Sequence, residues 1–327
     1  KRQLHITSTN IWPKEIKSIP VSRTNDILVI GDVMLDQYVS GSTDRLSPEA
    51  PVPVVKIDSQ FSVLGGAANV ANNLAALGAN VSLLGVVGRD DNARIVNELL
   101  EAKGIANQLL DADIFTTVKT RVISRNQQMV RVDREEVFSD EEAFVNHLSG
   151  VLSFFLGSAI IVSDYAKGVC SSEAMKVILT WATNNDVKVL IDPKGTDWSK
   201  YEGAFLIKPN VKELEELFNT SIENTNSEIA QFGKEIRSRY NIEHVLITRS
   251  EEGMTHIHDE ILHVKSRKVD IYDLSGAGDT VIAVLVFLIQ QGEDISIAIN
   301  KANQAGSYVI TKPNTYAISN TELNSLN

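Results

Sequence analysis

Hydrophobic residues follow two kinds of pattern along the chain, and each kind predicts a different type of element. Short continuous apolar runs are typical of strands buried on both faces of a parallel sheet. Segments with apolar residues three or four positions apart are typical of helices that cover such a sheet. The runs lie at residues 27–30, 81–87, 159–163, 187–191, 205–207 and 245–248, and the helical segments at 92–103, 141–156, 173–183, 211–218 and 229–240.

This alternation of strands and helices predicts an α/β fold with a mostly parallel sheet that is covered by helices on both faces. No internal repeat and no low-complexity linker divides the chain. We therefore expect one domain over residues 25–327, preceded by an N-terminal extension at residues 1–24.

Two further segments, residues 51–58 and 118–133, alternate apolar and polar residues. This alternation predicts half-exposed antiparallel strands, and the second segment is expected to be a hairpin that turns near Arg125 and Asn126. We interpret these strands as a small β lid, with a solvated edge of the main sheet as the alternative. Because exposed sheet edges can pair between molecules, a homodimer through the lid strands is a further expectation.

Composition narrows the class of protein. The chain has 327 residues, and the 43% that are hydrophobic suffice for a large buried core. Its 31 basic and 42 acidic residues give a formal net charge of −11 without a long basic stripe, which disfavours nucleic acid and anionic membranes as partners. Cys170 is the only cysteine, so an intrachain disulfide and a thiolate-rich metal site are excluded.

The chain also lacks signals for a membrane or a secretory route. Its longest apolar run, at residues 281–289, is shorter than the roughly 18 residues of a membrane-spanning helix. Residues 1–20 are polar and contain two prolines, Pro13 and Pro20, where a signal peptide would have an apolar block. We therefore expect a cytoplasmic protein.

The run at residues 273–279, Asp-Leu-Ser-Gly-Ala-Gly-Asp, leads into a long apolar segment that predicts a buried helix. Gly276, Ala277 and Gly278 leave the backbone amides of the first turn accessible, and such amides form a seat for a phosphate. A carboxylate beside that seat would repel an anion, so Asp279 is interpreted as a base that takes a proton from an attacking hydroxyl. An ordinary turn with Asp279 as a helix-capping residue is the alternative.

Polar residues near the N-terminal half of the predicted sheet are candidates for contacts to sugar hydroxyls. Asp32 and Asp36 follow the strand at residues 27–30, and a carboxylate accepts hydrogen bonds from neighbouring hydroxyls. Gly65 and Gly66 precede a helix and allow close approach of a ligand, while Asn69 offers a donor and an acceptor. Turn-forming acids and tight packing of a helix on a sheet are the alternative explanations.

Further polar segments follow other predicted strands, at residues 163–168, 192–195, 208–210 and 248–250. Because the carboxyl ends of parallel strands lie along one edge of a sheet, these segments are expected to share a crevice. Asn210 and Glu213 are three residues apart on one helical face, which suits hydrated Mg²⁺ and nucleotide phosphates. A capping box formed by the same two residues explains the spacing equally well, and both roles can hold at once.

Three of these features occur in the order typical of the ribokinase-like (PfkB) sugar kinases. They are Gly65-Gly66 with Asn69, residues 210–213 and residues 273–279. The resemblance covers about residues 27–318. Within that family the chain most resembles kinases that act on D-glycero-β-D-manno-heptose 7-phosphate in lipopolysaccharide core synthesis. The runs that carry this closer resemblance lie at residues 31–36, 46–54, 124–128 and 163–168.

The resemblance implies a ribokinase-like fold and transfer of phosphate from ATP, with Mg²⁺, to the anomeric hydroxyl of the heptose 7-phosphate, giving the 1,7-bisphosphate. Asp279 would be the general base, and the amides of Gly276, Ala277 and Gly278 would stabilise the transferring phosphoryl group. The sugar would be held by Asp32, Asp36, Gly65, Gly66 and Asn69, and its 7-phosphate would be bound by Arg121, Lys167 and Lys194. ATP would be lined by Asn210, Val211, Lys212, Glu213, Thr248, Gly253 and Asn303, with Mg²⁺ held by Glu213 through water. A monovalent cation such as K⁺ would be bordered by Asp273 and the carbonyl of Ser275.

The chain departs from the family pattern in places. Residues 312–315, Lys-Pro-Asn-Thr, stand where relatives usually have Gly-Thr, and Ala93 stands where many have glycine. No His-x-Gly-His and no nucleotidyltransferase domain occur, so either a stand-alone kinase or an excised kinase half is expected. A kinase for another sugar or nucleoside of the same family, and a non-catalytic sensor of sugar phosphate or nucleotide, remain the alternative functions.

Overall fold

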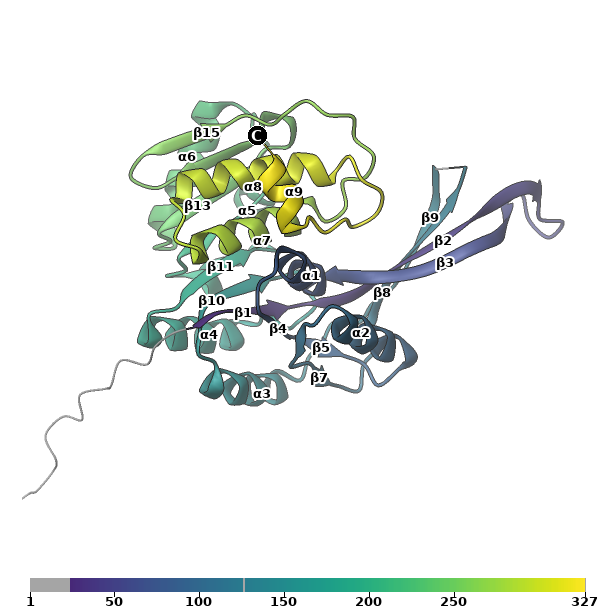
Figure 1. Cartoon of the computed structure of the whole chain (residues 1–327), viewed down its shortest axis with the longest axis horizontal. Coiled ribbons are helices and arrows are strands. Elements are labelled where there is room, and N and C mark those ends of the chain that lie inside the picture. Colours follow the sequence, from purple (N-terminus) through teal and green to yellow (C-terminus); the bar gives the residue numbers. More distant parts are fainter. Residues whose placement is uncertain (1–23, 126, 327) are drawn as a thin grey trace, which may run out of the picture.

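A nine-stranded sheet forms the body of the computed structural model, which describes residues 24–125 and 127–326 (Figure 1). Neighbouring strands are parallel from β13 to β6, and β14 and β15 add an antiparallel edge. The predicted mostly parallel sheet is thus confirmed. Across the sheet the strands are β15 (Ile261–Val264), β14 (Met254–Ile257), β13 (His244–Thr248), β12 (Leu206–Ile207), β11 (Lys188–Asp192), β10 (Gly157–Ser163), β1 (Thr24–Gly31), β4 (Val81–Leu84) and β6 (Ala106–Asn107).

Helices cover both faces of this sheet, as predicted, and form two separate hydrophobic cores. The most deeply buried is α7, in which every residue from Asp279 to Leu288 is buried. No helix of the described residues is long and apolar enough to cross a membrane. One core contains residues of α1 (Ala67–Leu77), α2 (Asp91–Ala102), α7 (Ala277–Gln290), α8 (Ile295–Val309) and α9 (Asn320–Ser325), and the other contains residues of α3 (Glu141–Phe154), α4 (Ser172–Asn185), α5 (Val211–Phe218) and α6 (Asn226–Arg239).

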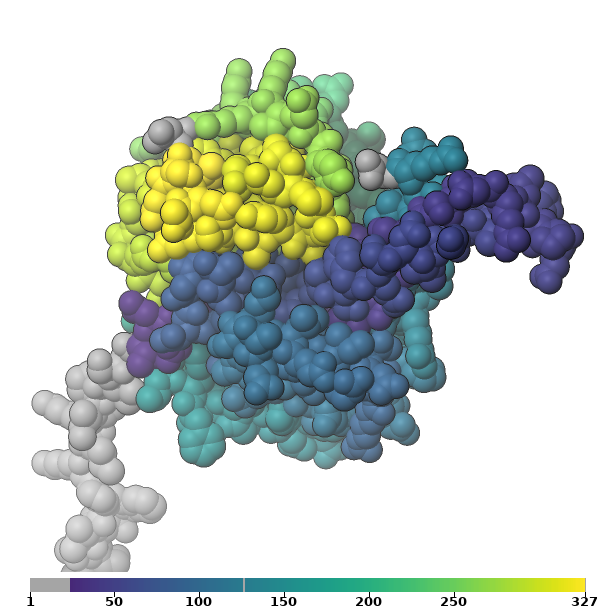
Figure 2. All heavy atoms as spheres, turned by 45° about the vertical axis from the view of Figure 1, so that its right-hand side comes forward, coloured from purple at the N-terminus to yellow at the C-terminus, as the bar shows by residue number. Residues whose placement is uncertain are grey.

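A smaller four-stranded sheet projects from the body (Figures 1 and 2). In order it contains β3 (Pro53–Gly66), β2 (Val33–Leu46), β8 (Thr117–Ser124) and β9 (Gln127–Arg134). β8 and β9 form the expected antiparallel hairpin, and β3 is antiparallel to β2. β2, which was not expected, runs parallel to β8. All eight residues of β9, at the edge, are exposed.

Some local expectations also need correction. The expected strand at residues 81–87 is interrupted at Gly85, where a side chain would meet the carbonyl oxygen of Gly31 at 2.5 Å, and Val86–Val87 pairs instead with Leu110–Asp111. Strand β2 and helix α8 were not predicted. The expected extension at residues 1–24 lies outside the described residues except for Thr24, as does Asn126 at the hairpin turn.

The order of the strands determines where a ligand can enter. β1 lies between β4 and β10, so the sheet extends in opposite directions from β1. A crevice forms outside the carboxyl ends of strands at such a reversal. Here those ends are Gly31 and its partner in β10, Ser163.

Gly31 allows these two strands to approach each other. A β-carbon at this position would lie 2.0 Å from the carbonyl oxygen of Ser163, so the backbone would have to move. We expect Gly31→Ala to lower the free energy of unfolding by about 1–3 kcal/mol. In contrast, Gly150 lies inside α3 with open space around it, so Gly150→Ala should be neutral or stabilising by up to about 1 kcal/mol.

Thermal and denaturant unfolding of the wild type and both variants measure this difference. If Gly31→Ala unfolds at the same midpoint as Gly150→Ala, close approach of β1 and β10 does not constrain the fold at this position.

Candidate active site

The carboxylate of Asp279 lies next to the loop that follows β10, in the first turn of α7, and Asp279 is only 4% exposed. Its two oxygens accept hydrogen bonds from different parts of the chain. The Asn69 side-chain amide of α1 donates to Oδ2 at 2.8 Å, and the Tyr165 hydroxyl donates to Oδ1 at 3.0 Å. These bonds join α1, α7 and the loop after β10 around one acidic group.

The surroundings of Asp279 raise its pKa to about 7, because burial disfavours the charged form. The hydrogen bond from Asn69 lowers the pKa, the charge of Asp192 raises it, and the hydrogen bond from Tyr165 and the charge of Lys208 lower it. A carboxyl with such a pKa exchanges a proton near neutral pH, which is the property a general base requires.

A second layer of polar contacts fixes Asn69. The Asn73 side chain, one helical turn further along α1, donates to the Asn69 carbonyl oxygen at 2.9 Å. The side-chain oxygen of Asn73 accepts a hydrogen bond from the Thr280 hydroxyl at 3.0 Å. Because Thr280 is the neighbour of Asp279, this bond ties α1 to the first turn of α7 a second time.

The start of α7 presents free backbone donors. Gly276 is the N-cap in the left-handed region, with φ 78°, and no side chain caps the helix. The first amides of a helix have no acceptor within the helix, so those of Gly278 and Asp279 are available to an anion. The Ala277 amide makes only a long contact, of 3.5 Å, to the Leu274 carbonyl. A β-carbon on Gly276 would lie 2.7 Å from Asn69 Nδ2, so a side chain there would displace the Asp279 contact.

A buried cation lies beside this turn. The Lys208 side chain, which follows β12, forms an ion pair of 2.9 Å with Asp192 at the end of β11. A β-carbon on Gly278 would lie 3.3 Å from Lys208 Nζ. The charges of Asp192 and Glu213 raise the pKa of Lys208 although its burial lowers it, so the ammonium stays charged.

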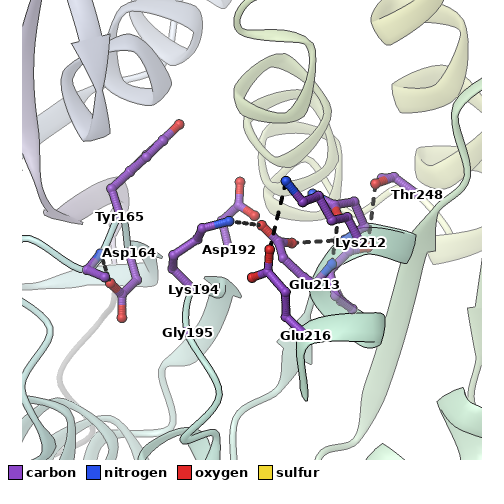
Figure 3. Close-up of polar contacts among 12 residues, drawn as sticks. Asp164, Tyr165, Asp192, Lys194, Gly195, Lys212, Glu213, Glu216 and Thr248 are labelled. Carbon is purple, nitrogen blue, oxygen red and sulfur yellow. Dashed lines mark hydrogen bonds and ion pairs between the residues drawn. The ribbon is translucent and has the colours of Figure 1, made fainter. Parts of the chain in front are cut away.

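Glu213 lies near Asp192 (Figure 3). Its pKa is raised, first by burial and then by the charge of Asp192. Lys194 reaches Glu213 with an ion pair of 3.3 Å. Two carboxylates so close together suit a divalent cation held through water.

Asn210 and Glu213 form the complete capping box that their spacing allows. Asn210 caps α5 by accepting from the Glu213 amide at 2.9 Å, and Glu213 accepts from the Asn210 amide at 3.0 Å. Thr248, at the end of β13, pairs with Asn210 through a parallel bridge. Val211 follows the cap, and the Lys212 side chain is 81% exposed and paired with Glu216.

Asp32, expected to contact the sugar, also has hydrogen-bond partners within the chain. Its carboxylate accepts hydrogen bonds from the amides of Tyr165, Lys167 and Val169, at 2.7, 3.1 and 3.3 Å. Burial, with the charge of Asp164, raises its pKa to about 6. These contacts hold the loop after β10 and thereby position the Tyr165 hydroxyl at Asp279.

Asp36 lies on β2 and forms an ion pair of 2.6 Å with Arg121 on β8. The Arg121 guanidinium also lies 5.4 Å from the centre of the Tyr38 ring. A β-carbon on Gly65 would lie 2.6 Å from Asp36 Oδ2, so this glycine leaves room for the carboxylate. Gly66, with φ 56°, immediately precedes α1.

The cations assigned to the sugar 7-phosphate lie apart. Lys167 forms an ion pair of 2.8 Å with Glu135, directly after β9, whereas Lys194 contacts Glu213 on the side assigned to ATP. Arg121 lies in the small sheet. The three cations therefore have three different acidic partners in this structure.

Asn303 and Gly253, assigned to the nucleotide, and Asp273 and Ser275, assigned to the monovalent cation, also have contacts within the chain. Asn303 of α8 donates to the Lys265 carbonyl at 2.8 Å, and Gly253, with φ 83°, lies close to the Val264 carbonyl. The Asp273 carboxylate accepts from the Ser275 amide at 2.8 Å.

The unusual residues 312–315 contact the same region, since Thr315 Cγ2 would lie 3.3 Å from a β-carbon on Gly276. Ala93 has its own local role, because its amide donates to the Asp90 cap of α2 at 2.9 Å. The departures from the family pattern are therefore accommodated by the fold.

Three central residues received no role from the sequence: Tyr165, Asp192 and Lys208. Each lies in a polar segment that follows a strand, and those segments were expected to share a crevice. The pattern thus identified the segments, but the choice of residue depends on which side chains point toward Asp279, which sequence spacing does not give.

Comparisons with known proteins agree with this arrangement. Bifunctional protein HldE of Shewanella loihica is 40% identical over 309 residues, covering 94% of this chain and 64% of that protein. Bifunctional protein HldE of Pectobacterium atrosepticum is 41% identical over 311 residues, again covering 94% and 64%. The chain therefore spans about 64% of the length of these relatives.

Solved structures share the fold. Phosphofructokinase-2 from Escherichia coli, in complex with potassium, has a TM-score of 0.79 at 18% identity and covers 93% of this chain and 98% of that chain. Ribokinase from Arabidopsis thaliana, complexed with ribose and ATP, has a TM-score of 0.72 at 16% identity, covering 92% and 98%. The expected ribokinase-like fold is confirmed. The family model described as pfkB family carbohydrate kinase matches residues 24–322, so the chain belongs to the pfkB family of carbohydrate kinases.

Proposed function

We propose that this chain transfers a phosphoryl group from ATP to the anomeric hydroxyl of D-glycero-β-D-manno-heptose 7-phosphate, with Asp279 as the general base. The observation that carries the proposal is the buried Asp279 carboxylate at the uncapped start of α7, next to the Lys208 ammonium. A proton acceptor, free amides and a fixed positive charge are the three groups that an in-line phosphoryl transfer requires.

In the proposed step the hydroxyl oxygen of the sugar attacks the γ-phosphorus of ATP. Its proton passes to the Asp279 carboxylate, an oxygen–phosphorus bond forms, and the bond to the leaving ADP oxygen breaks. The amides of Gly276, Ala277 and Gly278 hold the phosphoryl oxygens, and Lys208 offsets the negative charge that remains on the phosphates. No covalent enzyme intermediate is involved.

The residues around α5 fit the nucleotide and its cation. Mg²⁺ bound near Asp192 and Glu213 would neutralise phosphate charge, and both carboxylates lie beside Lys208. Asn210, Val211, Lys212, Thr248, Gly253 and Asn303 are proposed to border ATP. A monovalent cation at Asp273 and Ser275 is a further proposal, supported by the fold shared with phosphofructokinase-2, whose structure was solved in complex with potassium.

The choice of heptose 7-phosphate rests on the closer sequence resemblance at residues 31–36, 46–54, 124–128 and 163–168, together with the HldE relatives. The small sheet carries Asp36 and Arg121, which pair with each other, and Lys167 lies against its β9 end. In the proposed complex, Arg121 and Lys167 exchange these acidic partners for the sugar phosphate.

A substrate panel tests the proposed function. With ATP and Mg²⁺, we expect ADP release to have a kcat/KM at least about 10²-fold higher for heptose 7-phosphate than for fructose 6-phosphate, ribose or nucleosides, because a site with fixed polar partners rejects ligands that leave them unpaired. Preference for one of the other acceptors would assign the chain to another substrate of the family. Binding without ADP release for every acceptor would favour a sensor.

Removing the proton acceptor should leave binding intact. We expect Asp279→Asn to lower kcat by at least about 10²-fold with little change in the affinity for ATP, because only the base is lost. Asp294→Asn is the matched control, since Asp294 caps α8 and asparagine caps helices equally well. Steady-state kinetics and an ATP-binding titration make the comparison, and near-normal turnover in Asp279→Asn would remove this residue from the mechanism.

The pH dependence should report on Asp279. Activity needs the ionised carboxylate, whose pKa is about 7, so kcat/KM should rise with pH through this region. The Tyr165 hydroxyl lowers this pKa, so Tyr165→Phe should raise it and move the acid limb of the profile to higher pH.

Tyr308→Phe provides the control for this shift, because its hydroxyl bonds to Glu322, away from Asp279. The ionisation of the substrate phosphate is the same for the wild type, Tyr165→Phe and Tyr308→Phe. A difference between their pH profiles therefore reports on the enzyme. An acid limb that is identical in Tyr165→Phe and the wild type would show that Asp279 does not control it.

A further inference from the structure

Three of the six histidines in the chain gather on the β13–β14 pair. His244 begins β13, whose other end, Thr248, pairs with Asn210, one of the residues proposed to border ATP. Four residues of extended strand correspond to roughly 13 Å, so the cluster lies at the opposite edge of the sheet. None of its members takes part in the proposed phosphoryl transfer.

The strand register brings the rings together. Val245 pairs with Ile257 in antiparallel orientation, so the residues just outside this pair, His244 and His258, lie opposite each other on one face. Their ring centroids are 4.3 Å apart. His256 lies two residues before His258 on the same face, and its ring is 5.2 Å from that of His244.

An acidic residue completes the group. One ligand atom from each of Glu243, His244 and His258 lies within 4.8 Å of the other two. Two imidazoles and a carboxylate form a common ligand set for zinc, with bonds of about 2.0–2.2 Å and neighbouring ligand atoms roughly 3.3 Å apart. Small rotations of the side chains would therefore bring the three atoms to one cation.

The contacts around the cluster favour such rotations. Glu243 has 57% of its side chain exposed and His258 32%, and both border an open groove of about 800 Å³. The Arg237 guanidinium donates to the backbone carbonyls of Glu243 and His258, at 3.0 and 3.1 Å, which fixes the two backbones relative to each other. Arg237 also forms an ion pair with Asp259, with 3.0 Å between the guanidinium nitrogen and the carboxylate oxygen.

His256 is placed to hydrogen-bond His244. Its Nε2 lies 3.0 Å from His244 Nδ1, which leaves His244 Nε2 toward Glu243, at 3.5 Å. A second hydrogen bond of this kind orients a histidine that binds a metal. Burial lowers the pKa of His244 to about 3 and that of His256 to about 4, so both rings are neutral at neutral pH.

We propose that Glu243, His244 and His258 form a binding site for one divalent transition-metal cation, with Zn²⁺ as its representative. Imidazole nitrogen is the ligand that separates such ions from Mg²⁺, which prefers oxygen. The cation would link the start of β13 to the end of β14 and stabilise the antiparallel edge of the sheet, because a ligand that binds only the folded state raises stability.

Calorimetric titration of the untagged chain with Zn²⁺, in excess Mg²⁺, tests the proposal, since Mg²⁺ competes at sites made of carboxylates alone. We expect one zinc per chain and a rise in the thermal unfolding midpoint. His258→Gln and Glu243→Gln should each weaken zinc binding at least about tenfold, which is the smallest effect expected from losing even an outer partner. Both side chains are partly exposed, so the variants should fold, and their kinase activity should equal that of the wild type.

His147→Gln is the matched control, because His147 lies on α3 with its Nε2 bonded to the Gln108 carbonyl. This variant should bind zinc as the wild type does. Zinc binding that does not saturate at one equivalent, or that is unaffected by both His258→Gln and Glu243→Gln, would overturn the proposal. So would an equal loss of binding in His147→Gln, because it would reflect dispersed surface sites.

Discussion

The active centre depends on the two hydrogen bonds that hold the Asp279 carboxylate. Asn69 and Tyr165 donate to its separate oxygens, and they come from α1 and from the loop after β10. A buried carboxylate without such donors would be costly and would tend to stay protonated. With them, the carboxylate is held at the start of α7, as its proposed role as a base requires.

The rest of the fold supplies what these bonds require. The reversal of strand order at β1 brings the carboxyl ends of β1 and β10 together, and Asp32 uses three backbone amides to hold the loop that carries Tyr165. On the other side, α7 is buried over nearly its whole length, so its first turn is anchored against movement. Lys208, which follows β12, and Asp192, at the end of β11, form an ion pair beside this turn.

Much of this arrangement follows from sequence pattern. Continuous apolar runs gave the parallel strands, and the polar residues that follow them gave the crevice, because strand ends in such sheets converge. The run at residues 273–279 led to the candidate base and the anion seat. What pattern could not give was long-range pairing. The parallel contact between β2 and β8, the three amides that bond to Asp32, and the positions of Tyr165 and Lys208 each depend on contacts between distant segments.

The most direct measurement is a crystal structure of the chain with a sugar phosphate and a non-hydrolysable ATP analogue. If Asp279 is the base, the attacking hydroxyl oxygen will lie about 2.6–3.2 Å from one of its carboxylate oxygens, with the terminal phosphate on the amides of residues 276–278. A sugar bound with its reactive hydroxyl beyond reach of Asp279, or a terminal phosphate held elsewhere than on the start of α7, would contradict this mechanism.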